Sequence, residues 1–408
     1  MKLLYILQHF SGPQRSSSSR PYENIRRLVS KGHKVTLLCG RQATGYDEDI
    51  QAARGIGAEI HQSPIAYGQH MGYLQRLIAF RNHMKWSLNE GRKLSKPDLI
   101  FASSTPLTVG EVGRLLALHH KVPFVFEVRD VWPEIPHAMG MLKNPLLRWS
   151  AYRMAGRVYS ASDHIVALSP DMKTMIEKWG VLPDRISVVP NCSDNTIFGS
   201  SEGREEVRKR YGWENKFVCV HPGAMGAVNG LDYMIDCAKH MDSLGFDDIL
   251  LAIIGEGNQK SRLEKRIADE GIRSAVIYDP VPKRDMPGLL AASDAGMVCV
   301  TPCPVLAANS ANKFFDFLAA GLPVIINYGG WQAEYLKQYK CGYSLDPHMP
   351  SALADALTQL RDDETLRTTM AAEARALACE EFDRDKLVDQ LESILLAQVE
   401  SKSQTVMV

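Results

Sequence analysis

The strongest constraint on this chain is a repeated alternation of short apolar runs with longer stretches of helical periodicity. Residues 3–7 have the composition of a buried strand, residues 21–31 that of a helix, and residues 35–39 that of the next strand. This order is typical of a parallel sheet whose strands are joined by crossover helices. Further strands are predicted at 99–102, 124–128, 164–168 and 186–189, with a second series at 217–221, 249–254, 276–278, 296–300 and 323–326. The fold class is therefore predicted to be α/β, with two doubly wound parallel sheets.

The second series of strands follows a polar, charged stretch at residues 200–210, which marks the junction between two domains. A chain of 408 residues is long enough for two such domains, each with its own core. We expect one domain at 1–198 and another at 199–379, with a C-terminal helix at 380–400 packing back on the first. Ligands of doubly wound sheets bind beyond the carboxyl ends of the strands, and here also between the domains.

Charge and cysteine usage narrow the possible partners and surroundings. The 47 basic and 47 acidic side chains cancel, so we expect no nucleic-acid partner. The 8 cysteines are scattered, no secretory leader is recognised, and no apolar run approaches the roughly 20 residues of a membrane span. Cys299 and Cys303 have no second pair of ligands nearby, so no metal site is expected. These features favour a cytoplasmic protein with reduced thiols.

Two glycine-bearing loops follow predicted strands. Residues 222–230 read PGAMGAVNG and include Gly223 and Gly226. Such a loop can direct backbone N–H groups and a helix N-terminus at a phosphate, and glycine permits the close approach. A tight turn between strand and helix is an equally good interpretation. The loop from Gly12 to Arg20 in the first domain also has two interpretations. It either binds an anion or lines a cleft, or it is a flexible connection.

The most specific stretch is residues 312–321, which read NKFFDFLAAG. Lys313 and Asp316 stand three residues apart on the predicted helix and so face the same way. A lysine can offer charge to a diphosphate, and a neighbouring carboxylate can accept two hydrogen bonds from a ribose diol. A surface ion pair of little energetic value is the competing interpretation.

Together these segments resemble the GT-B glycosyltransferases of family 4, over nearly the whole chain. Residues 312–321 are similar to that family's donor-binding helix. Residues 127–134, EVRDVWPE, and residues 20–22 and 32–36 resemble its bacterial surface-polysaccharide branch, which includes N-acetyl-fucosaminyltransferases. The resemblance implies the GT-B fold, with two Rossmann-like domains facing a cleft, the first binding the acceptor and the second the nucleotide sugar.

The same resemblance implies an activity. The expected enzyme is a retaining, metal-independent transferase of hexosyl or N-acetylhexosaminyl units that needs no cofactor. Its donor would be a nucleoside-diphosphate sugar, with uridine as the expected base. Its acceptor would be a glycan linked to polyprenyl diphosphate, in the biosynthesis of O-antigen, capsule or exopolysaccharide.

Carried over to this chain, the family's donor site falls in the second domain. Asp316 would bind the ribose, Lys313 would lie near the diphosphate, and Val281 would flank the base. The other donor-binding positions are Gly223, Gly226, Asn229 and Asn312, of which Gly226 would supply backbone to the diphosphate.

This chain departs from the family pattern at three positions. The family often has a glutamate for the sugar hydroxyls where this chain has Ala308, and basic residues where it has Ala224 and Asn229. The diphosphate charge would then fall mainly on Lys313 and on backbone N–H groups.

The candidate catalytic residues come from the first domain, where the resemblance places Glu127, Arg129 and Asp130 close to the reacting sugar. Asp130 would orient the acceptor or stabilise the oxocarbenium-like centre, while the departing phosphate takes the proton from the acceptor. Electrostatic stabilisation of the leaving group requires no metal ion. A strand end held by ion pairs is the competing interpretation of these three residues.

Residues 70–96 are basic, rich in apolar and aromatic residues and contain one acid, Glu90. This composition suits a helix on an anionic membrane surface, and peripheral contact with the inner face of the cytoplasmic membrane is expected there. An ordinary crossover helix with a solvated basic face is the alternative.

Three other classes of protein compete with the transferase. A nicotinamide dehydrogenase would have a G-x-G-x-x-G loop after the first strand and an acid after the second, where this chain has Gly12 and Arg41. A UDP-sugar epimerase of GT-B architecture and a non-catalytic binding protein for nucleotide sugars or glycans are the other two.

Overall fold

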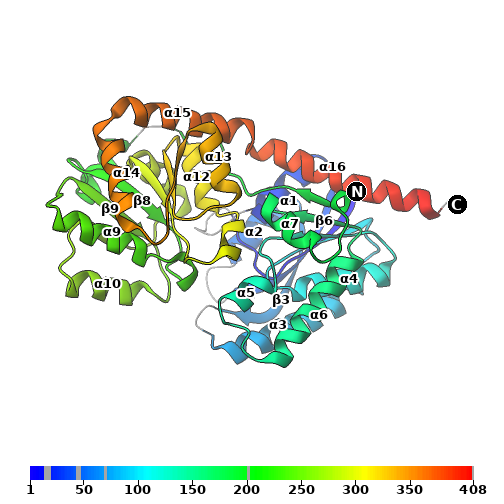
Figure 1. The fold of residues 1–408 in the computed structure, drawn as a ribbon. Helices are drawn as coiled ribbons and strands as arrows, with labels where there is room; N and C mark the ends of the chain where they lie inside the picture. Colours follow the sequence, from blue (N-terminus) through cyan, green and yellow to red (C-terminus); the bar gives the residue numbers. More distant parts are fainter. Residues whose placement is uncertain (13–19, 43–46, 69–70, 200–202, 407–408) are drawn as a thin grey trace. The chain divides into compact units, whose positions relative to one another are not determined.

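The computed structural model describes residues 1–12, 20–42, 47–68, 71–199 and 203–406. The chain divides into two compact units. Unit 1 comprises Met1–Pro190 and Asp385–Val408, and unit 2 comprises Asn191–Arg384. The division at 190/191 lies somewhat before the boundary at 198/199 expected from the sequence. Figure 1 shows both units as sheets flanked by helices.

Unit 1 contains a seven-stranded sheet in the order β3-β2-β1-β4-β5-β6-β7, and every pairing in it is parallel. The interior strands β4, β5 and β6 are buried along their whole length because helices cover both faces of the sheet. The strands are β1 (Lys2–Ile6), β2 (Lys34–Gln42), β3 (Glu59–Tyr67), β4 (Leu99–Ser103), β5 (Phe124–Val128), β6 (His164–Ala167) and β7 (Ile186–Val188).

The helices of unit 1 join these strands in sequence. They are α1 (Arg20–Ser30), α2 (Asp47–Gly55), α3 (Tyr73–Gly91), α4 (Thr108–His120), α5 (Glu134–Ala138), α6 (Pro145–Ala161), α7 (Pro170–Glu177) and the short η1 (Pro183–Arg185). Helix α4 packs between α3 and α6. The packing of α4 on α6 is tight, because a Cβ added at Gly110 would lie 2.7 Å from a methyl group of Val158.

Unit 2 contains a six-stranded parallel sheet in the order β10-β9-β8-β11-β12-β13. Its strands are β8 (Phe217–Pro222), β9 (Ile249–Ile254), β10 (Ala275–Tyr278), β11 (Ala295–Val298), β12 (Val324–Ile326) and β13 (Gly342–Ser344). Its helices are α8 (Arg204–Tyr211), η2 (Ala227–Asn229), α9 (Asp232–Ser243), α10 (Lys260–Asp269), η3 (Lys283–Asp285), α11 (Met286–Ala291), η4 (Pro304–Ala308), α12 (Asn312–Ala320), α13 (Trp331–Tyr339), α14 (Pro350–Asp362) and α15 (Glu364–Glu380).

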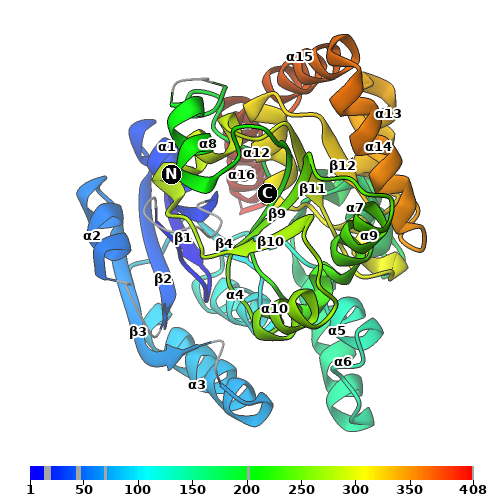
Figure 2. The same cartoon turned by 90° about the vertical axis from the view of Figure 1, so that its left-hand side faces the viewer.

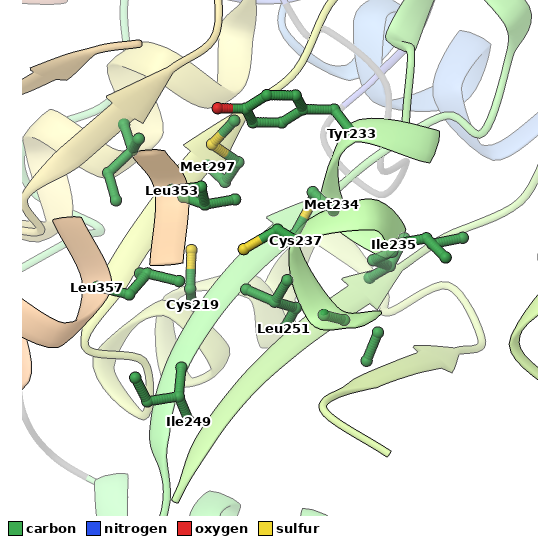
Figure 3. Packing of buried hydrophobic residues seen from close by; sticks show 14 of the residues in the cluster. Cys219, Tyr233, Met234, Ile235, Cys237, Ile249, Leu251, Met297, Leu353 and Leu357 are labelled. Atoms are coloured by element: carbon green, nitrogen blue, oxygen red, sulfur yellow. The ribbon is translucent and has the colours of Figure 1, made fainter. Parts of the chain in front are cut away.

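The core of unit 2 lies where β8, β9 and β11 meet α9 and α14. Figure 3 shows Cys219 and Met297 from the sheet beside Cys237 of α9 and Leu357 of α14. Cys299 belongs to the same buried cluster and packs there as a small apolar side chain. Burial raises the pKa of Cys299 to about 12, which keeps the thiol protonated.

The last helix, α16 (Arg384–Val406), packs on unit 1 beside α1 (Figure 1). Its acids meet the basic end of α1: Lys31 pairs with Asp389 and Glu392, and Nε2 of His33 lies 2.6 Å from Glu392. The interaction is one of complementary charge across two helices that are far apart in the sequence. None of the helices within the described ranges is long and apolar enough to pass through a bilayer.

Candidate functional site

Two loops at the carboxyl edge of the sheet in unit 2 pack directly on each other. The loop after β8 begins at Gly223, whose N–H donates to the carbonyl of Ile254 at 2.8 Å, and the N–H of Met225 donates to Glu256 at the same distance. A Cβ at Gly255 would lie 1.9 Å from the carbonyl oxygen of Gly223, so only glycine permits this approach. The Gly-Glu-Gly sequence after β9 therefore holds the loop after β8 in place.

This packing decides which N–H groups of the loop are available to a ligand. The N–H of Gly223, a predicted donor contact, is already used within the protein. Among the described residues, the N–H groups of Ala224 and Gly226 have no acceptor. Both residues lie at the surface of the loop, so a bound anion could receive hydrogen bonds from them.

Lys313 lies against this loop from the first turn of α12. Its Nζ is 2.9 Å from Nε2 of His221, the fifth residue of β8. A Cβ added at Gly223 would lie 3.1 Å from the same Nζ. The glycine thus allows the ammonium group to rest on the loop backbone.

His221 fixes the direction of the lysine. Its Nδ1 lies 3.0 Å from the carbonyl oxygen of Met297 in β11, and only a protonated Nδ1 can make that hydrogen bond. Burial, with Lys313 nearby, lowers the pKa of His221 well below its ordinary value. Nε2 of the neutral ring therefore accepts a hydrogen bond from Lys313.

The charge of Lys313 has no acidic partner within the described ranges of the chain. Burial lowers the pKa of this partly buried lysine to about 8, with Cys299 opposing the shift. A desolvated cation beside unused N–H groups favours an anionic ligand, since the ligand supplies the charge compensation that the protein withholds.

Asp316 lies one turn further along α12 and, like Lys313, is held by a hydrogen bond within unit 2. The hydroxyl of Ser193 donates to its Oδ1 at 2.7 Å. Burial raises the pKa of Asp316 above its ordinary value, while the hydrogen bond from Ser193 and the charges of Lys283 and Arg384 act in the opposite direction. The carboxylate is thus oriented by a buried serine from the segment that enters unit 2.

The remaining donor-site predictions lie near the same edge of the sheet. Asn312 begins α12, and Asn229 ends η2, where its N–H donates to Gly226 at 3.0 Å. Val281 follows β10 and lines a surface hollow of about 630 Å³ with Tyr211 and Tyr278. Ala308, which stands where the family often has a glutamate, is buried at the end of η4.

Two buried groups hold together the carboxyl ends of β4, β5 and β7 in unit 1. Arg20 donates to Oε1 of Glu127 at 3.0 Å and to the carbonyls of Val189 and Pro190 at 3.0 and 2.6 Å. The other carboxylate oxygen of Glu127 accepts from Ser103 at 2.5 Å. Both side chains are 5% exposed or less. Glu127, predicted to lie near the reacting sugar, forms a buried ion pair with Arg20, which fastens the segment after β7 to β5.

The other two catalytic candidates follow β5 and are more open. The N–H of Arg129 donates to the hydroxyl of Ser104 at 2.9 Å, and its side chain is partly buried. Asp130 is exposed. Glu127 lies within β5, whereas Asp130 lies two residues after the strand ends.

The glycine loop of unit 1 can be described only at its ends. Residues 13–19 lie outside the described part of the chain. Gly12 is buried, and a Cβ there would lie 2.4 Å from Oδ1 of Asp49 in α2, so glycine is needed for the loop to approach that helix.

Two histidines at the ends of strands were not predicted as site residues. His221 orients Lys313, and His9 follows β1 beside Tyr67, with ring centroids 4.7 Å apart. Burial and the charge of Arg129 lower the pKa of His9 to about 4. A polar residue that ends a buried apolar strand just before a loop is the sequence signal for both. In the part of the chain that the structure describes, no three or more His, Cys, Asp or Glu side chains are grouped to hold a metal ion.

Comparison with known proteins matches both units to described domain families. Residues 18–192 match the "Glycosyl transferase 4-like domain" family, and residues 203–377 match "Glycosyl transferases group 1". D-inositol 3-phosphate glycosyltransferase of Thermomonospora curvata is 26% identical over 65% of this chain. The match spans 64% of that relative's length, which is less than two thirds. The Escherichia coli colanic acid biosynthesis glycosyl transferase WcaI is 27% identical over 80% of this chain and 83% of its own.

Solved structures share the fold over almost the whole chain. HepE from Anabaena, solved in complex with UDP-glucose, has a TM-score of 0.74, with 18% identity over 97% of this chain and all of that chain. WaaG, described as a glycosyltransferase involved in lipopolysaccharide biosynthesis, has a TM-score of 0.70, with 18% identity over 96% of this chain and 99% of its own. With two parallel sheets and both domain families matched in order, the chain belongs to the GT-B glycosyltransferases of family 4.

Proposed function

We propose that this protein transfers a sugar from a nucleoside-diphosphate donor, with uridine as the expected base, to a glycan acceptor. The observation that carries the proposal is Lys313, held by neutral His221 over the loop after β8 without an acidic partner in the described residues. The ammonium group of Lys313 would compensate the negative charge of a bound diphosphate. Asp316, oriented by Ser193, would accept hydrogen bonds from the ribose. The complexes of HepE with UDP and UDP-glucose support the choice of donor.

The same groups account for leaving-group stabilisation. In the transition state negative charge accumulates on the departing diphosphate, where a fixed ammonium and preoriented N–H groups act most strongly. Lys313 and the N–H groups of Ala224 and Gly226 would take this role, with no metal ion needed. Retention of the anomeric configuration, with Asp130 orienting the acceptor, is part of the proposal.

The proposed acceptor is a glycan on polyprenyl diphosphate, used in the synthesis of a surface polysaccharide at the inner face of the cytoplasmic membrane. The names of WcaI and WaaG, which refer to colanic acid and lipopolysaccharide biosynthesis, support this class of acceptor. The relatives named for D-inositol 3-phosphate point to a small soluble acceptor as the specific competitor.

Thermal unfolding with UDP, GDP, ADP, CDP and NAD tests the donor site. A ligand at 100 times its dissociation constant stabilises the folded state by about 2.7 kcal/mol, which raises the melting temperature by a few degrees. We expect UDP to give this shift, and Asp316→Ala to abolish it. Asp385→Ala, a carboxylate change on the exposed side of α16, is the matched control and should keep the shift.

Release of UDP from a panel of UDP-sugars, with and without extracted lipid-linked glycans, tests the reaction. Transfer predicts that release depends on the acceptor, and inositol phosphate in its place separates the two acceptor classes. Asp130→Asn should lower turnover at least about tenfold without changing the UDP-induced shift. A shift with NAD alone, or no shift with any nucleotide, contradicts the proposed function.

A further inference from the structure

The first turns of α6 are exposed on all sides. Every residue from 143 to 150 is exposed, although a helix in a globular unit normally buries one side. Among these residues and just before them stand large apolar side chains: Leu146 is 75% exposed, Trp149 61% and Met141 52%. We call residues 141–153 the α6 tip.

The α6 tip is built to remain ordered while exposed. Oδ1 of Asn144 accepts hydrogen bonds from the N–H groups of Leu146 and Leu147 at 2.9 and 3.2 Å, and Pro145 occupies the first helical position. Asn144 caps the helix and Pro145 fixes its first φ angle. The second half of α6 buries Val158 and Tyr159 in unit 1. The helix is therefore anchored at its end and presents its beginning to solvent, at the edge of the unit that Figure 2 shows beside α5.

The charge on this segment has a single sign. Between Glu134 and Asp163 the sequence contains no acid, and its basic residues are Lys143, Arg148, Arg153 and Arg157. The guanidinium of Arg153 lies 5.2 Å from the ring centre of Trp149. Arg157 lies 3.5 Å from Glu111 and is partly compensated, so Lys143, Arg148 and Arg153 carry the net charge of the tip.

Helix α3, where the sequence predicts membrane contact, has a different surface. It buries Ala79, His83 and Ser87, and of its described side chains Ile78 is the large apolar one that is exposed. Its basic residues Arg81 and Lys85 are exposed, and Ile78 is the one large apolar side chain exposed near them among the described side chains of this helix. Residue 70 lies outside the described part of the chain. Among the described side chains of the two helices, α6 is the one that combines several exposed large apolar residues with basic ones.

We propose that the α6 tip docks unit 1 on an anionic lipid bilayer. Leucine, methionine and tryptophan gain by leaving water for the boundary between headgroups and acyl chains, and tryptophan favours that depth. Lys143, Arg148 and Arg153 meet the lipid phosphates. A helix turn exposed on all sides fits a fluid bilayer, which surrounds the inserted groups, whereas a protein groove would cover one side of the helix. The inference does not depend on the transfer reaction.

Sedimentation with vesicles tests the proposal. We expect the full chain to bind vesicles of phosphatidylcholine mixed with phosphatidylglycerol, to bind pure phosphatidylcholine much more weakly, and to dissociate as salt is raised. Leu146→Ser/Trp149→Ser should weaken binding at least about tenfold, because two large apolar groups no longer insert. The fluorescence of Trp149, obtained by subtracting the spectrum of Trp149→Phe, should shift to shorter wavelength with the mixed vesicles.

Matched variants distinguish this surface from others. Leu118→Ser/Leu182→Ser removes two equally exposed leucines elsewhere on unit 1 and should leave binding unchanged. Ile78→Ser on α3 should also leave it unchanged, and a large loss there would return the contact to α3. Retained vesicle binding by Leu146→Ser/Trp149→Ser would overturn the proposal. It would equally be overturned if the α6 tip formed a dimer in solution that this double variant dissolved, with no vesicle binding by the wild type.

Discussion

Arg20 of unit 1 and Lys313 of unit 2 both lie at the carboxyl edge of their sheet, and the surrounding protein treats these two cations in opposite ways. Arg20 of unit 1 is surrounded by acceptors: the carboxylate of Glu127 and two carbonyl groups. Lys313 of unit 2 has a neutral imidazole as its hydrogen-bond partner. The first cation is neutralised inside the fold and serves structure. The second remains uncompensated by an acid and is suited to binding.

The comparison predicts that removing the two cations affects different properties. When one member of a buried ion pair is removed, the charge of the other member remains buried and unpaired, so the free energy of unfolding falls. A buried charge without an oppositely charged partner already destabilises the fold. Its removal should therefore lower the affinity for the ligand and leave the free energy of unfolding intact.

Arg20→Ala should lower the free energy of unfolding by about 3–5 kcal/mol, because Glu127 would remain as a buried, unpaired carboxylate. Urea unfolding measures this change. Arg26→Ala is the control, since Arg26 makes an exposed pair with Glu23 on the same helix and should change stability by less than about 1 kcal/mol. Equal, small losses in both variants would mean that the buried pair does not hold unit 1 together.

Lys313→Met should leave the free energy of unfolding unchanged or slightly raised, because a partly buried charge is replaced by an apolar group of similar length. Its affinity for UDP should fall by about 2–3 kcal/mol, the usual worth of a charged hydrogen bond that is lost. Titration calorimetry measures the affinity. Lys239→Met, which removes an exposed lysine paired with Glu270, should bind UDP as the wild type does. Marked unfolding of Lys313→Met would place Lys313 in the same structural class as Arg20.

UDP affinity should fall as the pH rises through about 8. The pKa of Lys313 is lowered to about 8 by burial, so above that pH the free protein loses the ammonium, and affinity declines by up to tenfold per pH unit. The diphosphate keeps its charge in this range because a second phosphate pKa lies near about 6. Binding should also take up a proton near pH 8, detectable by calorimetry in buffers of different ionisation enthalpy. A flat profile in the wild type, identical to that of Lys313→Arg, would contradict this assignment.

His221→Leu should weaken UDP binding by about tenfold, since Lys313 keeps its charge but loses the hydrogen bond to the neutral ring that orients it. His221→Gln offers an acceptor again and should recover part of the affinity. Circular dichroism and melting temperature should be compared first, because His221 is fully buried. If both variants bind UDP as the wild type does, His221 does not direct the lysine.

The interior of both sheets was predictable because central parallel strands are apolar along their length. Ile249–Ile254 stands out in the sequence for this reason, and so does Phe124–Val128 apart from Glu127. The edge strand β3 was not predicted, because Glu59–Tyr67 alternates exposed polar and buried residues irregularly. The short edge strand β13, Gly342–Ser344, has too few residues to give a pattern.

The candidate site was predictable only where its residues share one element. Lys313 and Asp316 lie on one helix, so their spacing alone brings them together. Arg20 and Glu127 are 107 residues apart, and no local pattern indicates that they pair. The partnership of His221 with Lys313 depends on how β8, β11 and α12 are placed in three dimensions, which the composition of none of them reveals.

The position of α16 has a consequence for the order in which the protein can be completed during synthesis. Unit 1 takes its last helix from beyond residue 384, after all of unit 2 has been made. Until then Arg27, Lys31 and His33 stand without the acids of α16. A ribosome-bound chain that stops before this helix would therefore carry a finished unit 2 and an unfinished unit 1, so the domain that begins first is completed last.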